Sequence, residues 1–176
     1  MQINPKVFDI YHLNANDAHG GDGADFAKAY AAGFRGVIHK ATQGVNPKWN
    51  DRTYAARKDR AKKAGLLWGA YHFATDKDGV AQAEHFLGVV GDPADMLLCL
   101  DWEDNPQKDG SRDRMTYAQA IAFCTAIFEK TGQRPVLYGG NTLKELIPAN
   151  DTFLRHHRLW LCQYGPRAVC PKQWSA

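Results

Sequence analysis

The chain has 176 residues, a length typical of one domain with a sizeable buried core. Hydrophobic residues make up 44% of it and charged residues 23%, which argues against a disordered chain, and no apolar run is long enough to span a bilayer. The net charge is only +3, with Lys and Arg scattered along the chain, so a nucleic-acid-binding protein is weakly supported.

The amino terminus, MQINPKVFDI, lacks the basic region and apolar core of a secretory signal. We therefore expect the protein to be cytoplasmic when it is synthesised. The four cysteines show no close pair at the spacing of metal ligands. Cys162 and Cys170 can pair across a loop, although the reducing compartment expected for a chain without a signal favours free thiols.

The first strand is predicted from the run VFDIY at residues 7–11, which is rich in β-formers. It contains a carboxylate, Asp9, on the same face as Val7. After a glycine-rich loop, Asp25 is placed to cap a helix that Gly33 ends. The sequence therefore opens with a strand, a loop and a helix.

The second strand is predicted from GVIHKAT at residues 36–42, with Lys40 near its carboxyl end. A longer helix is expected to begin at Asp51 and to stop at Gly65. The third strand follows at once, over residues 67–73. Gly69 inside this strand indicates close packing of backbone or ligand.

The stretch MLLCLDWEDNP at residues 96–106 follows a predicted helix over residues 80–90 and combines a buried strand with three acidic residues. Alternate side chains of a strand share a face, so Cys99, Asp101 and Glu103 point one way while the intervening residues point the other. Two carboxylates therefore emerge side by side at the end of an apolar strand.

Three interpretations of these carboxylates stay open on the residues alone. Charges at the end of an apolar strand are costly unless they are solvated, paired or used in chemistry. Asp101 can cap a turn or pair with an arginine, while Glu103 is simply the first solvated residue. Clustered carboxylates also suit a hard divalent cation, and acid or base chemistry is the third possibility.

The second half of the chain continues the alternation. Thr116 and Gln119 form a capping box for a helix that ends at Gly132. A fifth strand is predicted over residues 135–139, then a short helix over residues 141–146 and a sixth strand over residues 159–164.

Strands that alternate with helices at this spacing predict right-handed crossovers and a parallel α/β sheet, either doubly wound or closed into a barrel. No glycine-rich phosphate loop follows the first strand, so nucleotide-binding versions have no support. In both architectures the functional face lies at the carboxyl ends of the strands. The polar and aromatic residues at or near those ends are Asp9, Lys40, Tyr71, Phe73, Asp101, Glu103, Tyr138 and Tyr164.

This set of side chains suits a sugar, because carboxylates bond hydroxyl groups and flat rings stack on pyranose faces. Each aromatic residue taken alone is more often explained by core packing. Their recurrence at the same end of successive strands favours a binding site for the set as a whole.

The chain resembles the glycoside hydrolase family 25 lysozymes, also called Chalaropsis-type muramidases. The resemblance covers residues 7 to about 165 and follows six segments in order: FDIY, GVIHKAT, AGLLWGAYHF, LCLDWED, RPVLYGG and RLWLCQYG. The combination of Asp9 in the first strand, the YHF strand end and the Asp-x-Glu strand end is specific, although no single piece is.

The resemblance implies a flattened β/α barrel of the TIM-like kind that cleaves the β-1,4 bond between N-acetylmuramic acid and N-acetylglucosamine in peptidoglycan. It implies that Glu103 is the general acid. It also implies that Asp101 supports the substrate's own acetamido group as that group attacks the anomeric carbon, and that Asp9 lines the site. We expect the remaining rim residues to bind substrate: Lys40, Tyr71, Phe73, Tyr138 and Tyr164.

No cofactor or metal is implied, and the expected partner is the glycan strand of peptidoglycan rather than nucleic acid or a membrane. Many relatives are phage endolysins, which wait in the cytoplasm and act on the wall after release. Residues i and i+2 of a strand are roughly 6.6 Å apart at the backbone. This spacing does not decide between a carboxylate nucleophile and an inverting pair, but it is compatible with substrate assistance.

One departure from the family concerns the carboxyl terminus. Members usually continue beyond the sixth strand with a Trp-rich strand and a segment carrying a further aspartate, whereas this sequence stops at residues 171–176. We therefore expect a single catalytic domain over residues 1–176 that is truncated and lacks its last one or two barrel strands. The exposed sheet edges would favour association, and the oligomeric state stays open.

Two alternative functions follow. The first is a catalytically inactive cell-wall carbohydrate-binding protein on the same fold, since an open barrel puts activity in doubt. The second is a glycosidase acting on chitin, for which the longer acidic strand motif typical of chitinases is absent.

Overall fold

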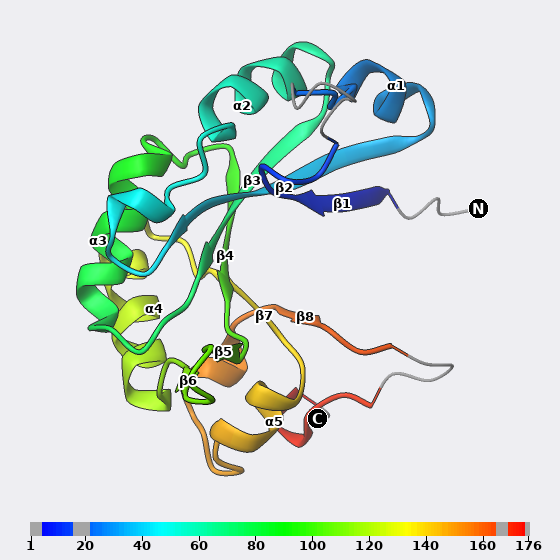
Figure 1. The fold of residues 1–176 in the computed structure, drawn as a ribbon. Helices are drawn as coiled ribbons and strands as arrows, with labels where there is room; N and C mark the ends of the chain where they lie inside the picture. Colours follow the sequence, from blue (N-terminus) through cyan, green and yellow to red (C-terminus); the bar gives the residue numbers. More distant parts are fainter. Residues whose placement is uncertain (1–4, 16–21, 165–168, 175–176) are drawn as a thin grey trace.

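A computed structural model describes residues 5–15, 22–164 and 169–174 of the chain. Its main sheet has six strands, all parallel to their neighbours, in the order β1-β2-β3-β4-β7-β8. The strands are β1 (Lys6–Ile10), β2 (Phe34–Gln43), β3 (Leu67–Phe73), β4 (Met96–Asp101), β7 (Val136–Gly139) and β8 (Leu159–Leu161). The sheet curls into a half-barrel with β1 and β8 at its two edges (Figure 1), which is a TIM-like barrel lacking some of its strands.

Helices cover the convex outer face of this sheet (Figure 1). The α-helices are α1 (Phe26–Ala31), α2 (Tyr54–Lys63), α3 (Gly79–Val90), α4 (Tyr117–Thr131) and α5 (Asn141–Leu146). Three short 3-10 helices span Pro47–Trp49, Leu154–His156 and Lys172–Trp174, and a small antiparallel pair, β5 (Asn105–Pro106) with β6 (Arg112–Asp113), follows β4. The main hydrophobic core lies between the helices and the outward side chains of the strands, and it includes Leu98 and Leu100 of β4 and Phe123 of α4.

The predicted helix caps are confirmed. The Asp25 carboxylate accepts a hydrogen bond of 2.8 Å from the Lys28 backbone, and Gly132 ends α4 in the left-handed conformation with φ of 70°. The capping box of α4 is also formed, because the Gln119 side chain accepts from the Thr116 backbone at 2.7 Å.

Two predicted boundaries are wrong by three residues each. Helix α2 begins at Tyr54 rather than at Asp51, because the Asp51 carboxylate instead binds the Thr53 backbone and hydroxyl in a turn before the helix. The sixth strand ends at Leu161 rather than at Tyr164. Its partner β7 ends at Gly139, where α5 starts, so ladder pairing stops after the Cys162 N–H binds the Gly139 carbonyl at 2.8 Å.

The concave face carries a second, smaller hydrophobic cluster built on Ile38, Cys99 and Val136. Gly69 lies on this face, and a Cβ atom there would come within 3.1 Å of both the Ile38 side chain and the Leu97 carbonyl. The close packing predicted at Gly69 is therefore confirmed, with backbone and core side-chain atoms as its neighbours.

The four cysteines are all free thiols, so Cys162 and Cys170 are not paired. Among the described residues, no helix combines the length and the apolar character that crossing a bilayer requires.

Candidate active site

The strand register brings the predicted rim residues to one level. Phe73 on β3 is paired with Asp101 on β4, which is paired with Tyr138 on β7. Tyr138 is in turn paired with Trp160 on β8. Two residues earlier on β3, and on the same face as Phe73, Tyr71 is paired with Lys40 on β2. Side chains that are far apart in the sequence therefore converge at the carboxyl ends of adjacent strands.

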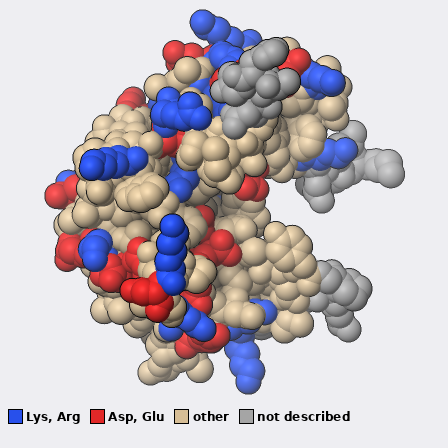
Figure 2. Space-filling model, in the orientation of Figure 1, with Lys and Arg blue, Asp and Glu red and all other residues tan. Residues whose placement is uncertain are grey.

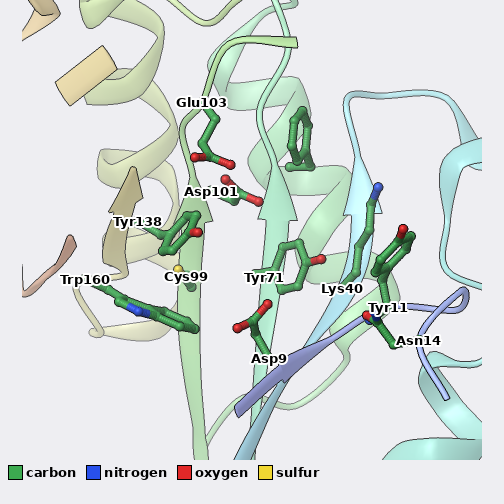
Figure 3. Close-up of a pocket in the computed structure, with 11 residues that line it drawn as sticks. Asp9, Tyr11, Asn14, Lys40, Tyr71, Cys99, Asp101, Glu103, Tyr138 and Trp160 are labelled. Atoms are coloured by element: carbon green, nitrogen blue, oxygen red, sulfur yellow. The ribbon is translucent and has the colours of Figure 1, made fainter. Parts of the chain in front are cut away.

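A cavity of about 360 Å³ opens at this level on the concave face. It is hollowed into the side of the molecule where β1 and β8 face each other, and acidic side chains are visible there (Figure 2). Its lining, shown in Figure 3, consists of Asp9, Tyr11, Asn14, Lys40, Tyr71, Phe73, Cys99, Asp101, Glu103, Tyr138 and Trp160. Seven of the eight predicted rim residues are thus brought together in one cavity.

Asp101 is the last residue of β4 and the most deeply placed acid in the cavity, with 7% of its surface exposed. Its Oδ1 atom has no hydrogen-bond partner among the described residues. Burial raises the pKa of Asp101 well above its ordinary value, and the nearby charge of Glu103 raises it further, while Lys40 acts in the opposite direction. A buried acid with an oxygen that lacks a hydrogen-bond partner in the described protein is costly to keep charged.

Glu103 lies two residues beyond Asp101 and is half-buried. The residue between them, Trp102, points to the other side of the sheet and is fully buried there, with its indole N–H donating to the Met115 carbonyl at 2.8 Å. The Trp102 backbone N–H also donates to the Tyr138 carbonyl at 2.8 Å. Trp102 therefore holds the chain so that the carboxyl groups of Asp101 and Glu103 face one another (Figure 3).

Lys40 is the cation that lines the cavity. Its Nζ donates to the Gln43 side chain at 2.6 Å and lies 5.3 Å from the centre of the Phe73 ring. Burial lowers the pKa of Lys40, and the charge of Asp101 partly opposes this effect. The lysine therefore acts on Asp101 through its charge, without a direct ion pair between them among the described contacts.

Asp9 approaches the cavity from the edge strand β1, where it is solvent-exposed. Tyr11 follows on the same side of the chain and belongs to the post-β1 loop, which we define as residues 11–15. Burial raises the pKa of Tyr71, and the carboxylates of Asp101 and Asp9 raise it further. Tyr71 is therefore a neutral hydroxyl that can donate or accept a hydrogen bond.

The wall opposite Asp9 is aromatic. The rings of Tyr138 and Trp160 are 4.9 Å apart and nearly perpendicular, with an interplanar angle of 72°. Burial raises the pKa of Tyr138, as does its hydrogen bond with Cys162. Flat rings beside carboxylates give this cavity the mixed surface that a sugar ring requires.

Tyr164 is the one predicted rim residue outside this cavity. It is 92% exposed and lies beyond the end of β8. It lines a second, shallower cavity of about 560 Å³ together with Lys144 and Glu103. Glu103 thus borders both cavities.

Four lining residues were not predicted to belong to the site: Tyr11, Asn14, Cys99 and Trp160. The alternation of the first strand placed Tyr11 beside Asp9 and that of the central strand placed Cys99 beside Asp101, so the signal for these two was available. Trp160 required the register of β8, and Asn14 required the path of a loop. Neither can be read from local periodicity.

Among the described residues, no group of three or more His, Cys, Asp or Glu side chains is arranged to hold a metal ion. The expectation of activity without a metal therefore stays a prediction.

Paired carboxylates and aromatic rings at the carboxyl ends of a parallel α/β half-barrel are an arrangement typical of carbohydrate sites in glycosidases. Residues 8–176 match the family described as "Glycosyl hydrolases family 25". The chain belongs to this family.

The most similar proteins agree with the family. The chain is 33% identical over 126 residues to an N,O-diacetylmuramidase of Chalaropsis sp, a match covering 65% of this chain and 59% of the relative. It is 37% identical over 75 residues to an autolytic lysozyme of Clostridium acetobutylicum, covering 42% of this chain but only 22% of the relative. The chain therefore spans less than two thirds of these relatives' lengths. A solved muramidase structure from Trichobolus zukalii superposes with a TM-score of 0.77 and 26% identity, covering 96% of this chain and 82% of the other.

Proposed function

We propose that the protein is a peptidoglycan hydrolase, an N-acetylmuramidase that cleaves the β-1,4 bond between N-acetylmuramic acid and N-acetylglucosamine. The observation that carries the proposal is the pairing of Asp101 and Glu103 in one cavity at the rim of a family 25 fold. The similarity to muramidases and to an autolytic lysozyme supports this substrate class.

Glu103 is the proposed general acid. It is only half-buried, borders both cavities and has its carboxyl group directed into the cavity that Asp101 lines (Figure 3). A glycan strand that crosses both cavities would place a glycosidic oxygen beside Glu103, which would donate its proton as the bond breaks. The proton would later be recovered from the attacking water, so the acid is regenerated.

Asp101 is the proposed support for the substrate's acetamido group. That group attacks the anomeric carbon through its oxygen and becomes positively charged as it does so. Charging Asp101 is costly because the residue is buried, and a developing positive charge beside it offsets that cost. The interaction is therefore stronger in the transition state than in the ground state, which is the condition for raising kcat.

The other rim residues are the proposed substrate contacts. Asp9 and Lys40 offer charged groups to hydroxyl and amide groups of the sugar, and Tyr71, Phe73 and Tyr138 offer rings and hydroxyls. Tyr164 would contact a neighbouring sugar unit in the second cavity. The partner is accordingly the glycan strand of a bacterial wall. Cytoplasmic synthesis before action on the wall stays a prediction, which fractionation of producing cells would test.

The decisive experiment compares lysis with binding for the unaltered chain and for Glu103→Gln. We expect the unaltered chain to clear a suspension of purified cell walls and Glu103→Gln to sediment with the walls without clearing them. A protein of this fold that only binds carbohydrate would give sedimentation without clearing in both cases. Equal clearing by both proteins would remove Glu103 from the proposed role.

A further inference from the structure

The post-β1 loop supplies two lining residues of the cavity, Tyr11 and Asn14, although it lies outside the sheet. Within the loop, the Tyr11 N–H donates to the Asn14 side chain at 2.8 Å, and the Asn14 N–H donates to the Tyr11 carbonyl at 2.9 Å. These bonds fix the shape of the loop but not its place relative to the strands. Its position must therefore depend on contacts with other elements.

The His12 N–H donates to the Asp51 carboxylate at 2.7 Å, and the contacts of Tyr11 and Asn14 come from Arg57 on α2. Its side chain is completely buried, although it lies in the strongly charged segment YAARKDRAKK. Its Nη1 donates to the Tyr11 carbonyl at 2.9 Å and its Nη2 donates to the Asn14 carbonyl at 2.8 Å. The guanidinium group therefore binds the backbone at both ends of the segment from Tyr11 to Asn14.

Arg57 also binds the side chains of Asp22 and His39. Nε and Nη2 lie 3.0 Å and 2.8 Å from Oδ1 of Asp22, which supplies the opposite charge. Nη1 lies 3.3 Å from Nε2 of His39. Four of the five N–H donors of the guanidinium group thus have a hydrogen-bond acceptor, and Nη2 also contacts the Asp22 carboxylate. A lysine, with three donors on one atom, cannot reproduce this arrangement.

His39 connects this group to the floor of the site. Its Nδ1 lies 2.7 Å from the Lys40 carbonyl, so Nδ1 carries the proton and Nε2 accepts from Arg57. Burial lowers the pKa of His39, which agrees with a neutral ring. Arg57 therefore joins the post-β1 loop to the strand segment that carries Lys40.

We propose that Arg57 is a positioning residue that holds Tyr11 and Asn14 at the rim of the cavity and thereby sets how tightly the glycan binds. This inference rests on the proposed function. Arg57 touches backbone carbonyls from behind the loop and is fully buried, so it acts through the loop and not on the substrate. It makes no contact with Asp101 or Glu103 among the described residues, and the chemical step should therefore not depend on it directly.

Arg60 provides a matched control on the same helix. It binds the same acid, Asp22, at 2.7 Å and also binds the Ala24 carbonyl. Its side chain is 44% exposed, and it contacts no residue that lines the cavity. A change at Arg60 thus weakens the tie between α2 and Asp22 while leaving the post-β1 loop attached.

The kinetic test uses soluble peptidoglycan fragments. For Arg57→Lys we expect KM to rise about five- to tenfold with kcat within about twofold, because binding is lost and chemistry is kept. Arg60→Lys should change both constants by less than about twofold. A fall in kcat at unchanged KM would overturn the proposal.

A second arm asks whether Arg57 acts through the loop. In a Tyr11→Ala/Asn14→Ala background, Arg57→Lys should change KM by less than about twofold, because the groups that it positions are gone. An equal rise in KM in both backgrounds would show that Arg57 has only a general structural effect.

A third arm needs no activity. Amide hydrogen exchange at residues 11–14 should become about tenfold faster in Arg57→Lys and stay unchanged in Arg60→Lys. If Arg57→Lys does not fold, Arg57→Gln takes its place, because the glutamine amide is uncharged and has only two donors for the Tyr11 and Asn14 carbonyls. Unchanged exchange in a folded variant would overturn the proposal.

If the unaltered chain cleaves nothing, the proposed function fails, while the hydrogen-exchange experiment still decides the role of Arg57.

Discussion

Two buried polar side chains on opposite faces of the half-barrel, His72 and Asp101, differ in their hydrogen bonding. On the convex face, His72 is fully buried, and its ring binds the Thr42 hydroxyl at 2.7 Å and the Gln82 side chain at 3.1 Å. On the concave face, Asp101 is almost as buried, yet its Oδ1 atom has no partner among the described residues. His72 is thus satisfied within the fold, whereas Asp101 retains an acceptor that a ligand can use.

The strand period of two produces this separation within single strands. Along β4 and the residue pair after it, Leu100 and Trp102 enter the core while Asp101 and Glu103 enter the cavity. A one-residue shift of register would exchange the two sets. Substitution of a residue that faces the cavity should therefore lower activity, whereas substitution of its neighbour that faces the core should lower stability.

The largest effect is expected for Glu103→Gln. Loss of a general acid lowers kcat by about 10² to 10⁴. Because Glu103 is half-buried and holds no core contact, the melting temperature should change little. Release of reducing ends from purified walls, followed alongside thermal unfolding, measures both. Activity within threefold of the unaltered chain would exclude the assignment.

Trp102→Ala should have the opposite profile, although residue 102 adjoins both acids. Its indole ring is fully buried and donates to the Met115 carbonyl, so truncation should cost about 3–5 kcal/mol of unfolding free energy. Urea unfolding gives this value. If the variant is instead as stable as the unaltered chain and only its kcat falls, the separation of the two faces is wrong at this position.

Asp101→Asn should lose activity and gain stability. We expect kcat to fall about 10² to 10³, as for loss of a preorganised electrostatic contact. Since the pKa of Asp101 is raised in the fold, the carboxyl group favours folding below the ordinary pKa of aspartate, and this contribution disappears as pH rises toward the raised value.

At neutral pH the raised pKa of Asp101 therefore destabilises the fold, because the unfolded chain releases this proton more readily, and the neutral amide should raise the melting temperature. Each kcal/mol gained corresponds to roughly 2–4 °C for a chain of this size. Thermal scans at pH 7 and at pH 3 provide the comparison, with the stabilisation present at the higher pH and absent at the lower. A lower melting temperature at pH 7 would mean that Asp101 is stabilised by its surroundings after all.

A smaller effect is expected from His72 on the convex face. Burial lowers the pKa of His72 to about 4, so the unfolded chain takes up a proton before the folded chain does. Stability is therefore fully present above pH 6.5 and declines as pH falls toward 4. The difference between 6.5 and about 4 corresponds to roughly 3 kcal/mol at most. The slope of unfolding free energy against pH should be shallower in His72→Asn, and equal slopes would exclude this residue as the cause.

The smallest effect is expected from removal of metal ions. Asp9, Asp101 and Glu103 are assigned to acid, electrostatic and binding roles, so activity after thorough chelation should equal that of the untreated protein. Loss on chelation with recovery on adding Mg²⁺ or Ca²⁺ would favour the divalent-cation interpretation of this cluster.

The sequence predicts much of this molecule because its signals are local. Alternation along β4 placed Asp101 and Glu103 on one face, and capping residues located helices α1 and α4. Six parallel strands and a site at their carboxyl ends followed from the same patterns, and the family resemblance agrees with the match over residues 8–176.

Features that depend on distant partners could not be predicted. Arg57 is surrounded in the sequence by charged residues that face water, and only the carbonyl groups of the post-β1 loop, more than forty positions earlier, account for its burial. Trp160 lines the cavity because β8 pairs with β7, although α5 separates these two strands in the sequence. The end of β8 at Leu161 likewise depends on where its partner strand stops.

The central claim is that Glu103 in the concave cavity cleaves the muramic acid linkage of peptidoglycan. Mass spectrometry of the soluble products from purified walls tests it most directly, because the sugar at the new reducing end identifies the bond that was broken. The account predicts fragments ending in reducing N-acetylmuramic acid with the unaltered chain and none with Glu103→Gln. Fragments ending in reducing N-acetylglucosamine, or the same fragments from both proteins, would contradict it.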